Sequence, residues 1–214
     1  MTDLVGRPLS PGSDTPPTET DGRRLRRAVN REAVVDALLD LYQEGNLRPG
    51  TEEIAERAGI SPRSLFRYFE DTDDLAGEAV TRQLARALPL VQIGIDATAP
   101  FADRVQALVE QRFRLFGAVG QAAHVTRLRA PFQPRLAETL AESRRFLRSQ
   151  LQALFGRELE AMGDPRAELA LAAADVLATF ESYQLLTSAQ GLSVADAMTV
   201  VGRSLTVLLS PDGS

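Results

Sequence analysis

Residues 51–71, TEEIAERAGISPRSLFRYFED, decide how this chain folds. Gly59 interrupts a short helical pattern. Ser61 followed by Pro62 is a typical helix start, because serine caps a helix and proline fits its first position. Thr51 is predicted to cap the first helix in the same way. Two short helices joined by a tight, glycine-containing turn form a helix-turn-helix.

The second helix of this pair has an inner and an outer face. Leu65 and Phe69 share the inner face, which places Arg63 and Arg67 on the opposite side. A helix with that geometry fits the DNA major groove, where arginine makes a bidentate contact with guanine. Three neighbours are expected to reach a base edge, a thymine methyl group or a phosphate: Ser64, Phe66 and Tyr68. The alternative is an ordinary helical hairpin within a bundle, whose outer face is simply solvated.

The composition narrows the possible functions. The 214 residues carry a net charge of -5, so a nucleic-acid contact has to come from a local basic patch. Cysteine is absent, there is one histidine, and no Glu-x-x-His or glycine-rich phosphate motif occurs, so we expect no metal, no cofactor and no enzymatic activity. No apolar run approaches the roughly 20 residues of a membrane span, and the N-terminus lacks a signal-peptide pattern. We therefore expect a cytoplasmic protein without a membrane partner.

Helical patterns continue through most of the chain, so the predicted fold class is all-α. The expected organisation is a disordered tail over residues 1–22, a three-helix helix-turn-helix DNA-binding domain over 23–71, and a larger helical domain over 72–214. Within the last domain, helices are expected near residues 101–117, 133–160, 165–189 and 193–209.

Five arginines and no acid lie between residues 23 and 31, at the start of the first helical pattern. Arg26 and Arg27 of this run are expected to add contacts to DNA phosphates. The alternative is a solvated basic tail, because the run follows the segment that is expected to be disordered.

The stretch Thr51 to Val80 closely resembles the DNA-binding signature of the TetR family of bacterial transcriptional regulators. The residues that carry the likeness are Thr51, Ile54-Ala55, Ala58-Gly59-Ile60-Ser61, Ser64-Leu65-Phe66, Tyr68-Phe69 and Leu75. The likeness extends from Arg27 to Leu84. It implies a homodimer, commonly a repressor, that binds a palindromic double-stranded DNA operator. It also implies a C-terminal domain that binds a small-molecule effector and dimerises.

Two positions depart from the family pattern. Phe66 stands where tyrosine is common, which removes a hydroxyl contact to phosphate. Thr72 stands where lysine is common, and the acids around it, Asp71, Asp73 and Asp74, would repel phosphate. The complete set of expected DNA-binding residues is Arg26, Arg27, Thr51, Ser61, Arg63, Ser64, Phe66, Arg67, Tyr68 and Thr72.

A ligand pocket is expected where residues 110–136 mix phenylalanines with arginines and the single histidine. Ligand pockets are mostly apolar with a few placed polar groups, so we expect an apolar effector of unidentified structure. The candidate effector-binding residues are Phe113, Phe116, His124, Arg127, Phe180, Tyr183 and Gln184. The alternative is a set of ordinary core aromatics beside solvated arginines, with the histidine held by a structural hydrogen bond.

The segment 165–189 is apolar on two opposite faces when it is drawn as one straight helix. One stripe, with Leu169, Val176 and Phe180, is expected to pack on the domain's own core. The other stripe and part of the last helix are expected to form a four-helix dimer interface: Leu171, Ala174, Ala178, Ser182, Leu185, Val200 and Val207. The alternative is that both faces lie inside one monomeric core.

Two other classes of function remain open from the sequence. One is a carboxylate-based enzyme on an all-α scaffold, since the chain holds 29 acidic residues. The other is an oligomerisation module without sequence-specific DNA binding.

Overall fold

The computed structural model describes residues 19–210. Every regular element in this range is helical, which confirms the all-α fold class. The α-helices are α1 (Glu19–Gln43), α2 (Thr51–Arg57), α3 (Pro62–Leu65), α4 (Thr72–Ala87), α5 (Phe101–Arg129), α6 (Pro134–Leu154), α7 (Gly156–Met162), α8 (Arg166–Leu177), α9 (Phe180–Gln184) and α10 (Val194–Leu209). Three short helical turns follow α4, α5 and α9: η1 (Leu88–Leu90), η2 (Ala130–Phe132) and the π-helical η3 (Leu185–Ala189).

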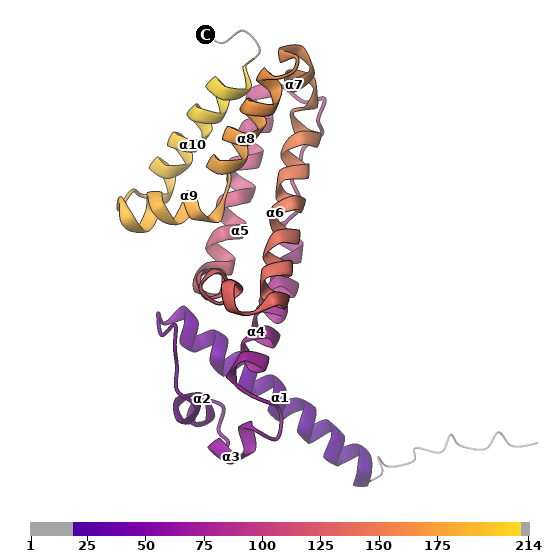
Figure 1. Ribbon diagram of the computed structural model, residues 1–214, viewed down its shortest axis with the longest axis vertical. Coiled ribbons are helices and arrows are strands. Elements are labelled where there is room, and N and C mark those ends of the chain that lie inside the picture. The colour runs from indigo at the N-terminus through magenta and orange to yellow at the C-terminus, as the bar shows by residue number, and fades with distance from the viewer. Residues whose placement is uncertain (1–18, 211–214) are drawn as a thin grey trace, which may run out of the picture.

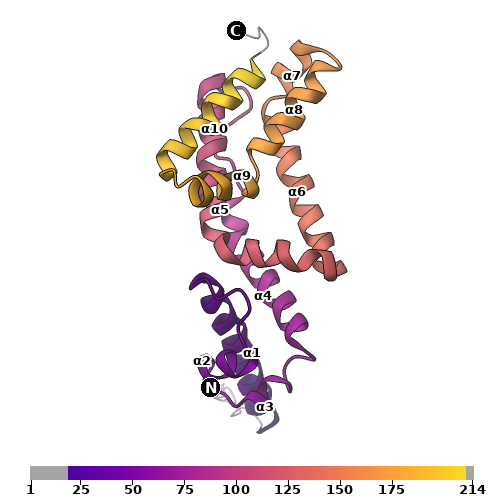
Figure 2. The ribbon, with the colours of Figure 1, turned by 60° about the vertical axis from the view of Figure 1, so that its left-hand side comes forward.

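The helices are arranged along one long axis (Figure 1). α1, α2 and α3 form one end, α5 to α10 form the other, and α4 runs between the two. The view turned by 60° shows the same arrangement, with the last part of α5 crossing the molecule toward α6 (Figure 2).

A small core holds α1, α2, α3 and α4 together. Leu38 of α1, Leu65 of α3 and Leu75 of α4 are almost fully buried in it. Ala122 and Val125 of α5 close the same core from the other side. The predicted division at residue 72 therefore falls at the start of a helix that packs with both parts of the chain.

The larger core is built from the apolar stripes of α5, α6, α8 and α10, with α7 at its end. Leu108, Phe155, Ala174 and Leu205 are completely buried there. A buried ion pair between Arg104 of α5 and Glu158 of α7 lies at the same end, where the Arg104 guanidinium also donates to the carbonyl of Leu154.

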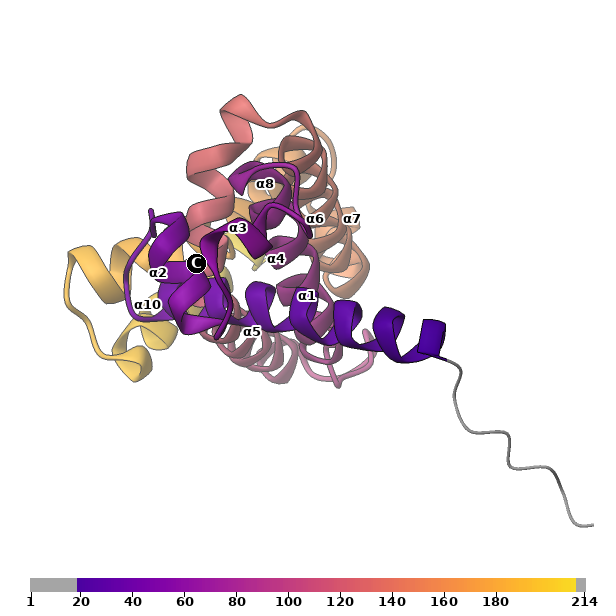
Figure 3. The same ribbon diagram turned by 90° about the horizontal axis from the view of Figure 1, so that it is seen from below.

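α1 begins earlier than the sequence predicts. Of the predicted disordered tail, residues 1–18 lie outside the described range, but residues 19–22 form the first turn of α1. The arginines and leucine that follow are strong helix formers, which explains the extension. The N-terminal half of α1 projects away from the other helices (Figure 3).

α5 continues past residue 117, where the sequence predicts its end. The break falls instead at Gly120, whose φ of 42° and ψ of -130° are non-helical, and the chain continues as helix to Arg129. Glycine accepts this backbone conformation without a steric cost. The two parts of α5 therefore point in different directions, which decides which of its side chains share a face.

Two other predicted helices are interrupted. The pattern over 133–160 divides between α6 and α7 at Phe155. The pattern over 165–189 divides at Ala178 and Thr179, where the Thr179 hydroxyl accepts a hydrogen bond from the Ser182 amide and caps α9. A threonine that bonds to nearby backbone competes with helix continuation. α8 and the segment Phe180–Ala189 are bent by 48°.

Within the described residues, no single helix is long and apolar enough to cross a membrane. The bent pair of α8 and Phe180–Ala189 meets the length and composition criterion only when its two parts are taken together.

Candidate DNA interface and ligand cavity

The turn between α2 and α3 is fixed by backbone hydrogen bonds. Gly59 has a φ of 68°, its amide donates to the carbonyl of Glu56, and the Ile60 amide donates to the carbonyl of Ala55. This pair of bonds is the Schellman motif that ends a helix in a left-handed residue. Ser61 then caps α3 by accepting a hydrogen bond from the Ser64 amide, as predicted.

The predicted cap at Thr51 is wrong. The N-cap position of α2 is Gly50, which has no side chain to accept a hydrogen bond, and Thr51 is the first helical residue. Both residue types occur before helices, so the sequence alone does not separate the two positions. Thr51 is half-buried there.

α3 has only four helical residues, and the chain continues as a turn through Tyr68. Leu65 and Phe69 are buried, while Arg63, Phe66 and Arg67 are exposed, which confirms the predicted inner and outer faces. The contacts of these residues to DNA stay a prediction.

α1 holds in place the end of residues 62–68, the candidate recognition segment. Arg27 Nη2 donates to the carbonyl of Arg67 at 3.3 Å, and Asn30 Nδ2 donates to the Tyr68 hydroxyl at 3.1 Å. The Tyr68 hydroxyl therefore keeps its own hydrogen for another acceptor. Asn30 has no signal of function in the sequence, because only the packing of α1 on α3 brings it to Tyr68.

The arginine run of α1 divides into exposed and paired residues. Arg24, Arg26 and Arg27 are exposed. Arg31 makes a two-pronged ion pair with Glu78 of α4, at 2.8 and 3.1 Å, and its guanidinium carbon lies 5.0 Å from the centre of the Phe69 ring. Arg31 therefore links α1 to α4 at the edge of the small core.

The acids around Thr72 are engaged within the protein. Asp71 Oδ1 accepts hydrogen bonds from the amides of Asp73 and Asp74, both at 2.8 Å, and so caps α4. Asp73 forms an ion pair with Arg129 at the end of α5, at 2.7 Å. Thr72 itself is half-buried in the first turn. The ion pair offsets part of the negative charge that the sequence places there.

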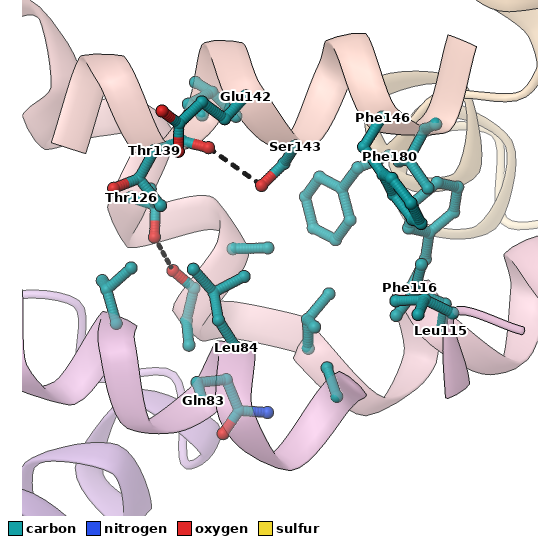
Figure 4. Close-up of a pocket in the computed structure, with 18 of the residues that line it drawn as sticks. Gln83, Leu84, Leu115, Phe116, Thr126, Thr139, Glu142, Ser143, Phe146 and Phe180 are labelled. Atoms are coloured by element: carbon teal, nitrogen blue, oxygen red, sulfur yellow. Dashed lines mark hydrogen bonds between the residues drawn. The ribbon is translucent and has the colours of Figure 1, made fainter. Parts of the chain in front are cut away.

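A cavity of about 380 Å³ lies between α4, α5, α6 and α9 (Figure 4). Its wall is almost entirely apolar, and Phe116, Phe146 and Phe180 gather at one side. The side chains that line it are Val80, Gln83, Leu84, Ala87, Leu88, Val91, Leu115, Phe116, Val119, Ala122, Ala123, Thr126, Arg127, Thr139, Leu140, Glu142, Ser143, Phe146, Leu147 and Phe180.

Three of the seven predicted effector residues line this cavity, namely Phe116, Arg127 and Phe180. The other four do not. Phe113 and Tyr183 pack edge to face with ring centres 5.3 Å apart, and His124 Nδ1 lies 2.9 Å from Gln184 Nε2. The break at Gly120 sets His124 and Phe113 on different parts of α5, so a straight-helix projection does not give their true faces.

The sequence prediction missed the walls that α4 and α6 supply. Val80, Leu84 and Ala87 of α4 and Leu140 and Phe146 of α6 line the cavity. Apolar residues at these spacings also occur on any helix that packs on a core. No sequence signal distinguishes the two roles.

The rim of the cavity carries a charged cluster. Arg127 Nε donates to Glu181 at 2.9 Å, and Arg144 Nη2 donates to the same carboxylate oxygen at 2.5 Å. The Arg127 guanidinium also lies over the Phe180 ring, 4.3 Å from its centre. Partial burial alone would raise the pKa of Glu181, but the bonds and charges of the two arginines outweigh it and lower that pKa to about 2.

The predicted dimer seam on α8 is wrong. Leu171, Ala174 and Ala178 are buried in the chain's own core, so they have no surface to offer a partner. Leu169 and Val176, which are predicted to face that core, are 72% and 64% exposed. Helical periodicity finds the two apolar faces of α8, but it does not say which one the rest of the chain covers.

The remaining predicted seam residues have different positions. Ser182 lies beyond the break after α8, and its hydroxyl donates to the carbonyl of Val176 at 2.6 Å. Leu185, Val200 and Val207 are exposed. Pairing of these three residues with a partner stays a prediction.

The family model of bacterial regulatory proteins, tetR family, matches residues 34–79. The HTH-type transcriptional regulator BetI of Serratia proteamaculans is 30% identical over 180 residues, which is 80% of this chain and 87% of that protein. BetI of Cronobacter sakazakii is 30% identical over 175 residues, which is 76% of this chain and 81% of the relative.

Solved structures with the same fold have lower identity. A transcriptional regulator from Rhodococcus sp. Rha1 has a TM-score of 0.60 and 22% identity, covering 84% of this chain and 95% of that one. A TetR-family transcriptional regulator from Mesorhizobium loti has a TM-score of 0.61 and 18% identity, covering 86% and 96%.

Proposed function

Because the chain belongs to the TetR family of bacterial transcriptional regulators, we propose that it binds a palindromic operator as a homodimer and represses transcription until an apolar small molecule releases it. It is a regulator and not an enzyme. Since a bacterial operator lies in the cytoplasm, we place its action there.

The observation that carries the DNA half of this proposal is the outer face of α3. Arg63 and Arg67 are exposed on a segment whose start is capped by Ser61 and whose end is bonded to α1 through Arg27. A fixed backbone removes the cost of ordering this segment on binding, so that only the two arginine side chains have to be ordered. They are therefore the candidates for base contacts, while the arginines of α1 are candidates for phosphate contacts.

The homodimer is supported by an apolar outer surface on α8 and α10. Leu169 and Val176 of α8 and Val200 and Val207 of α10 are between 41% and 72% exposed. α8 and α10 pack side by side in each chain, so two copies would bury this surface in a four-helix bundle. We propose these four residues as the dimer interface in place of the buried residues of α8.

α4 is proposed to connect the effector to the operator. Its first half, with Leu75 and Ala79, belongs to the small core under α3, and its second half, with Leu84 and Ala87, lines the cavity. A ligand that prefers one position of α4 would shift the population of dimers between two spacings of their recognition segments. Only one spacing matches two half-sites that lie one helical turn of DNA apart.

The test is selection of operator sequences from a randomised DNA pool with the full chain. We expect an inverted repeat, bound by two chains. Thermal-shift screening of apolar compounds against the same protein then tests the effector. Binding without sequence preference would support the oligomerisation alternative, whereas a clear operator with no stabilising compound would remove only the effector half of the proposal.

A further inference from the structure

Three hydroxyl groups line the cavity, and each has already donated its hydrogen. Thr126 Oγ1 donates to the carbonyl of Ala122 at 2.8 Å, and Ser143 Oγ donates to the carbonyl of Thr139 at 2.9 Å (Figure 4). Thr139 Oγ1 donates to the carbonyl of Arg135 at 2.9 Å. A hydroxyl that has donated its hydrogen keeps only acceptor lone pairs. These three groups therefore offer acceptors to a bound molecule.

Gln83 of α4 adds a fourth acceptor. Its Nε2 donates to the carbonyl of Ala118 at 2.7 Å, which fixes the orientation of the amide because only the nitrogen can donate to a carbonyl. Its Oε1 is buried and has no hydrogen-bond partner within the described residues. The whole side chain is only 7% exposed. Oε1 has less than 1 Å² of exposed surface, so a donor on a ligand reaches it only when the cavity wall shifts, and pairing this unsatisfied acceptor favours that shift.

The charged groups on the wall do not favour an anion. Arg127 is the cation that lines the cavity among the described residues, and it is already paired with Glu181 and bonded to the carbonyl of Ala123 at 3.0 Å. Glu142 is the carboxylate on the wall, and it is exposed. A charged ligand group would lose its hydration in an apolar cavity without a buried counter-ion, which is costly for either sign of charge.

We propose that the effector is an apolar molecule whose polar group is an uncharged hydrogen-bond donor, such as an alcohol hydroxyl. This inference rests on the proposed function of the cavity as the effector site. The acceptors come from α4, α5 and α6, so a donor that reaches them bridges the helices around the cavity.

The strongest competing ligand is a carboxylate, because Arg112 lies close behind the wall. Arg112 is 2% exposed, and burial lowers the pKa of its guanidinium to about 10, so it stays charged at neutral pH. It does not line the cavity. Its Nη1 donates to Gln150 at 2.9 Å and its Nη2 donates to the carbonyl of Leu147 at 2.9 Å. Its Nε has no hydrogen-bond partner among the described residues, but Arg112 is not among the residues that line the cavity, so a carboxylate there gains no direct hydrogen bond from it.

The test compares three compounds that share the same carbon chain and differ in their polar group: 1-decanol, its methyl ether and decanoate. Binding of each to the full chain is measured by titration calorimetry. We expect 1-decanol to bind about tenfold more tightly than the ether, which has no donor, and than decanoate. This ranking is measured on the unaltered protein and so does not depend on whether any variant folds.

Two double variants, one in the cavity wall and one as a control, then locate the acceptors. Gln83→Leu combined with Ser143→Ala removes one acceptor on α4 and one on α6, and we expect the advantage of 1-decanol over the ether to disappear. The matched control is Thr81→Val combined with Ser149→Ala. These residues lie on the same two helices and also donate to backbone carbonyls, at 3.0 and 2.8 Å, but do not line the cavity. The control is expected to keep the full preference.

Three outcomes would overturn the inference. If decanoate or the ether binds as tightly as 1-decanol, the inference that the effector carries an uncharged donor is wrong, while the cavity remains the effector site. If the control pair loses the preference as fully as the cavity pair, the acceptors lie elsewhere. If none of the compounds binds, the cavity is not an effector site for such compounds and the inference about the donor falls with it, but operator binding, which is measured separately, is untouched.

Discussion

At the scale of single residues, the recognition segment depends on a few positions that fix the backbone. Gly59 provides the positive φ that ends α2, Ser61 caps α3, and Asp71 caps α4. None of these residues has to touch DNA to be important. They set the direction in which Arg63 and Arg67 point.

The first prediction concerns Gly59. Its φ of 68° is unfavourable for a residue with a side chain, although a Cβ would meet no atom within 4 Å. Gly59→Ala should therefore destabilise the protein by about 1–2 kcal/mol from backbone conformation alone. Urea unfolding measures this. Gly77→Ala is the control, because Gly77 lies inside α4 without a positive φ, and alanine there should stabilise by about 0.5–1 kcal/mol. Equal effects at the two positions would contradict the left-handed turn.

The second prediction concerns the two outward arginines. Arg63→Ala and Arg67→Ala should each weaken operator binding by about 1–3 kcal/mol and relax specificity at one position in each half-site. The carbonyl of Arg67 that accepts from Arg27 is retained in the variant, so the backbone should stay in place. Arg157→Ala in α7, at the far end of the molecule, is the charge control. Unchanged affinity in both α3 variants would reject the docking of α3 in the major groove.

The third prediction concerns the pH dependence of stability. The pKa of Glu181 is about 2 in the folded protein against 4.5 in the unfolded reference. A lowered folded-state pKa gives stability that is present above pH 4.5 and disappears as the pH falls toward 2. Glu181→Gln should remove that part of the acid sensitivity. Unfolding at a series of pH values tests this, with Glu138→Gln on the exposed side of α6 as the control. Identical acid profiles of Glu181→Gln and the unaltered chain would contradict it.

At the level of elements, α1 has two differently packed halves. Its C-terminal half is buried in the small core, and its N-terminal half projects from the body with exposed arginines (Figure 3). Arg31 marks the change, because it is paired with Glu78. Arg24 and Arg26 of the projecting half are exposed and lie before Arg27, the residue that bonds to Arg67, so they are free to serve an external contact.

The fourth prediction therefore concerns the projecting half of α1. Arg24→Gln combined with Arg26→Gln should weaken binding to all DNA sequences alike. It should also reduce the slope of log affinity against log salt by about 0.9 for each phosphate that the variant no longer neutralises. Operator titrations at several salt concentrations measure this. Arg31→Gln is the contrasting variant, since it should lower stability by removing the ion pair with Glu78. A salt slope that does not change in the double variant would show that α1 stays clear of the DNA.

At the level of the whole molecule, two helices, α4 and α5, and the ion pair between them connect the cavity with the recognition segment. α4 contributes to the small core and to the cavity wall. Arg129 at the end of α5 is paired with Asp73 at the start of α4, so the two helices that border both sites are joined. We propose that a change in the position of α4 alters both sites.

The fifth prediction concerns assembly. Val176→Glu and Val207→Glu should convert the proposed dimer to a folded monomer, because each places a charge on the exposed apolar surface of α8 and α10. Ala174→Glu should instead prevent folding, since Ala174 is completely buried. Sedimentation and circular dichroism separate these outcomes. If both surface variants remain dimeric, or if the parent chain is a monomer, the dimer interface lies elsewhere.

The local features of this protein depend on residues that are close together in the sequence. The positive φ at Gly59, the cap at Ser61 and the inner position of Leu65 and Phe69 follow from interactions between residues only a few positions apart. For the same reason the helix-turn-helix, the all-α class and the outward arginines could be predicted without coordinates.

Which surfaces meet depends on the packing of helices that are far apart in the sequence. A residue such as Ala174 or Val176 lies on an apolar face of α8 in either case, and the neighbouring helices choose which face is covered. The break at Gly120 changes the direction of the last part of α5. The cavity is also lined by residues of α4 and α6, and no local sequence pattern predicts that lining. Burial depends on the sum of all packing interactions across the chain, whereas periodicity reports only the faces that are available for it.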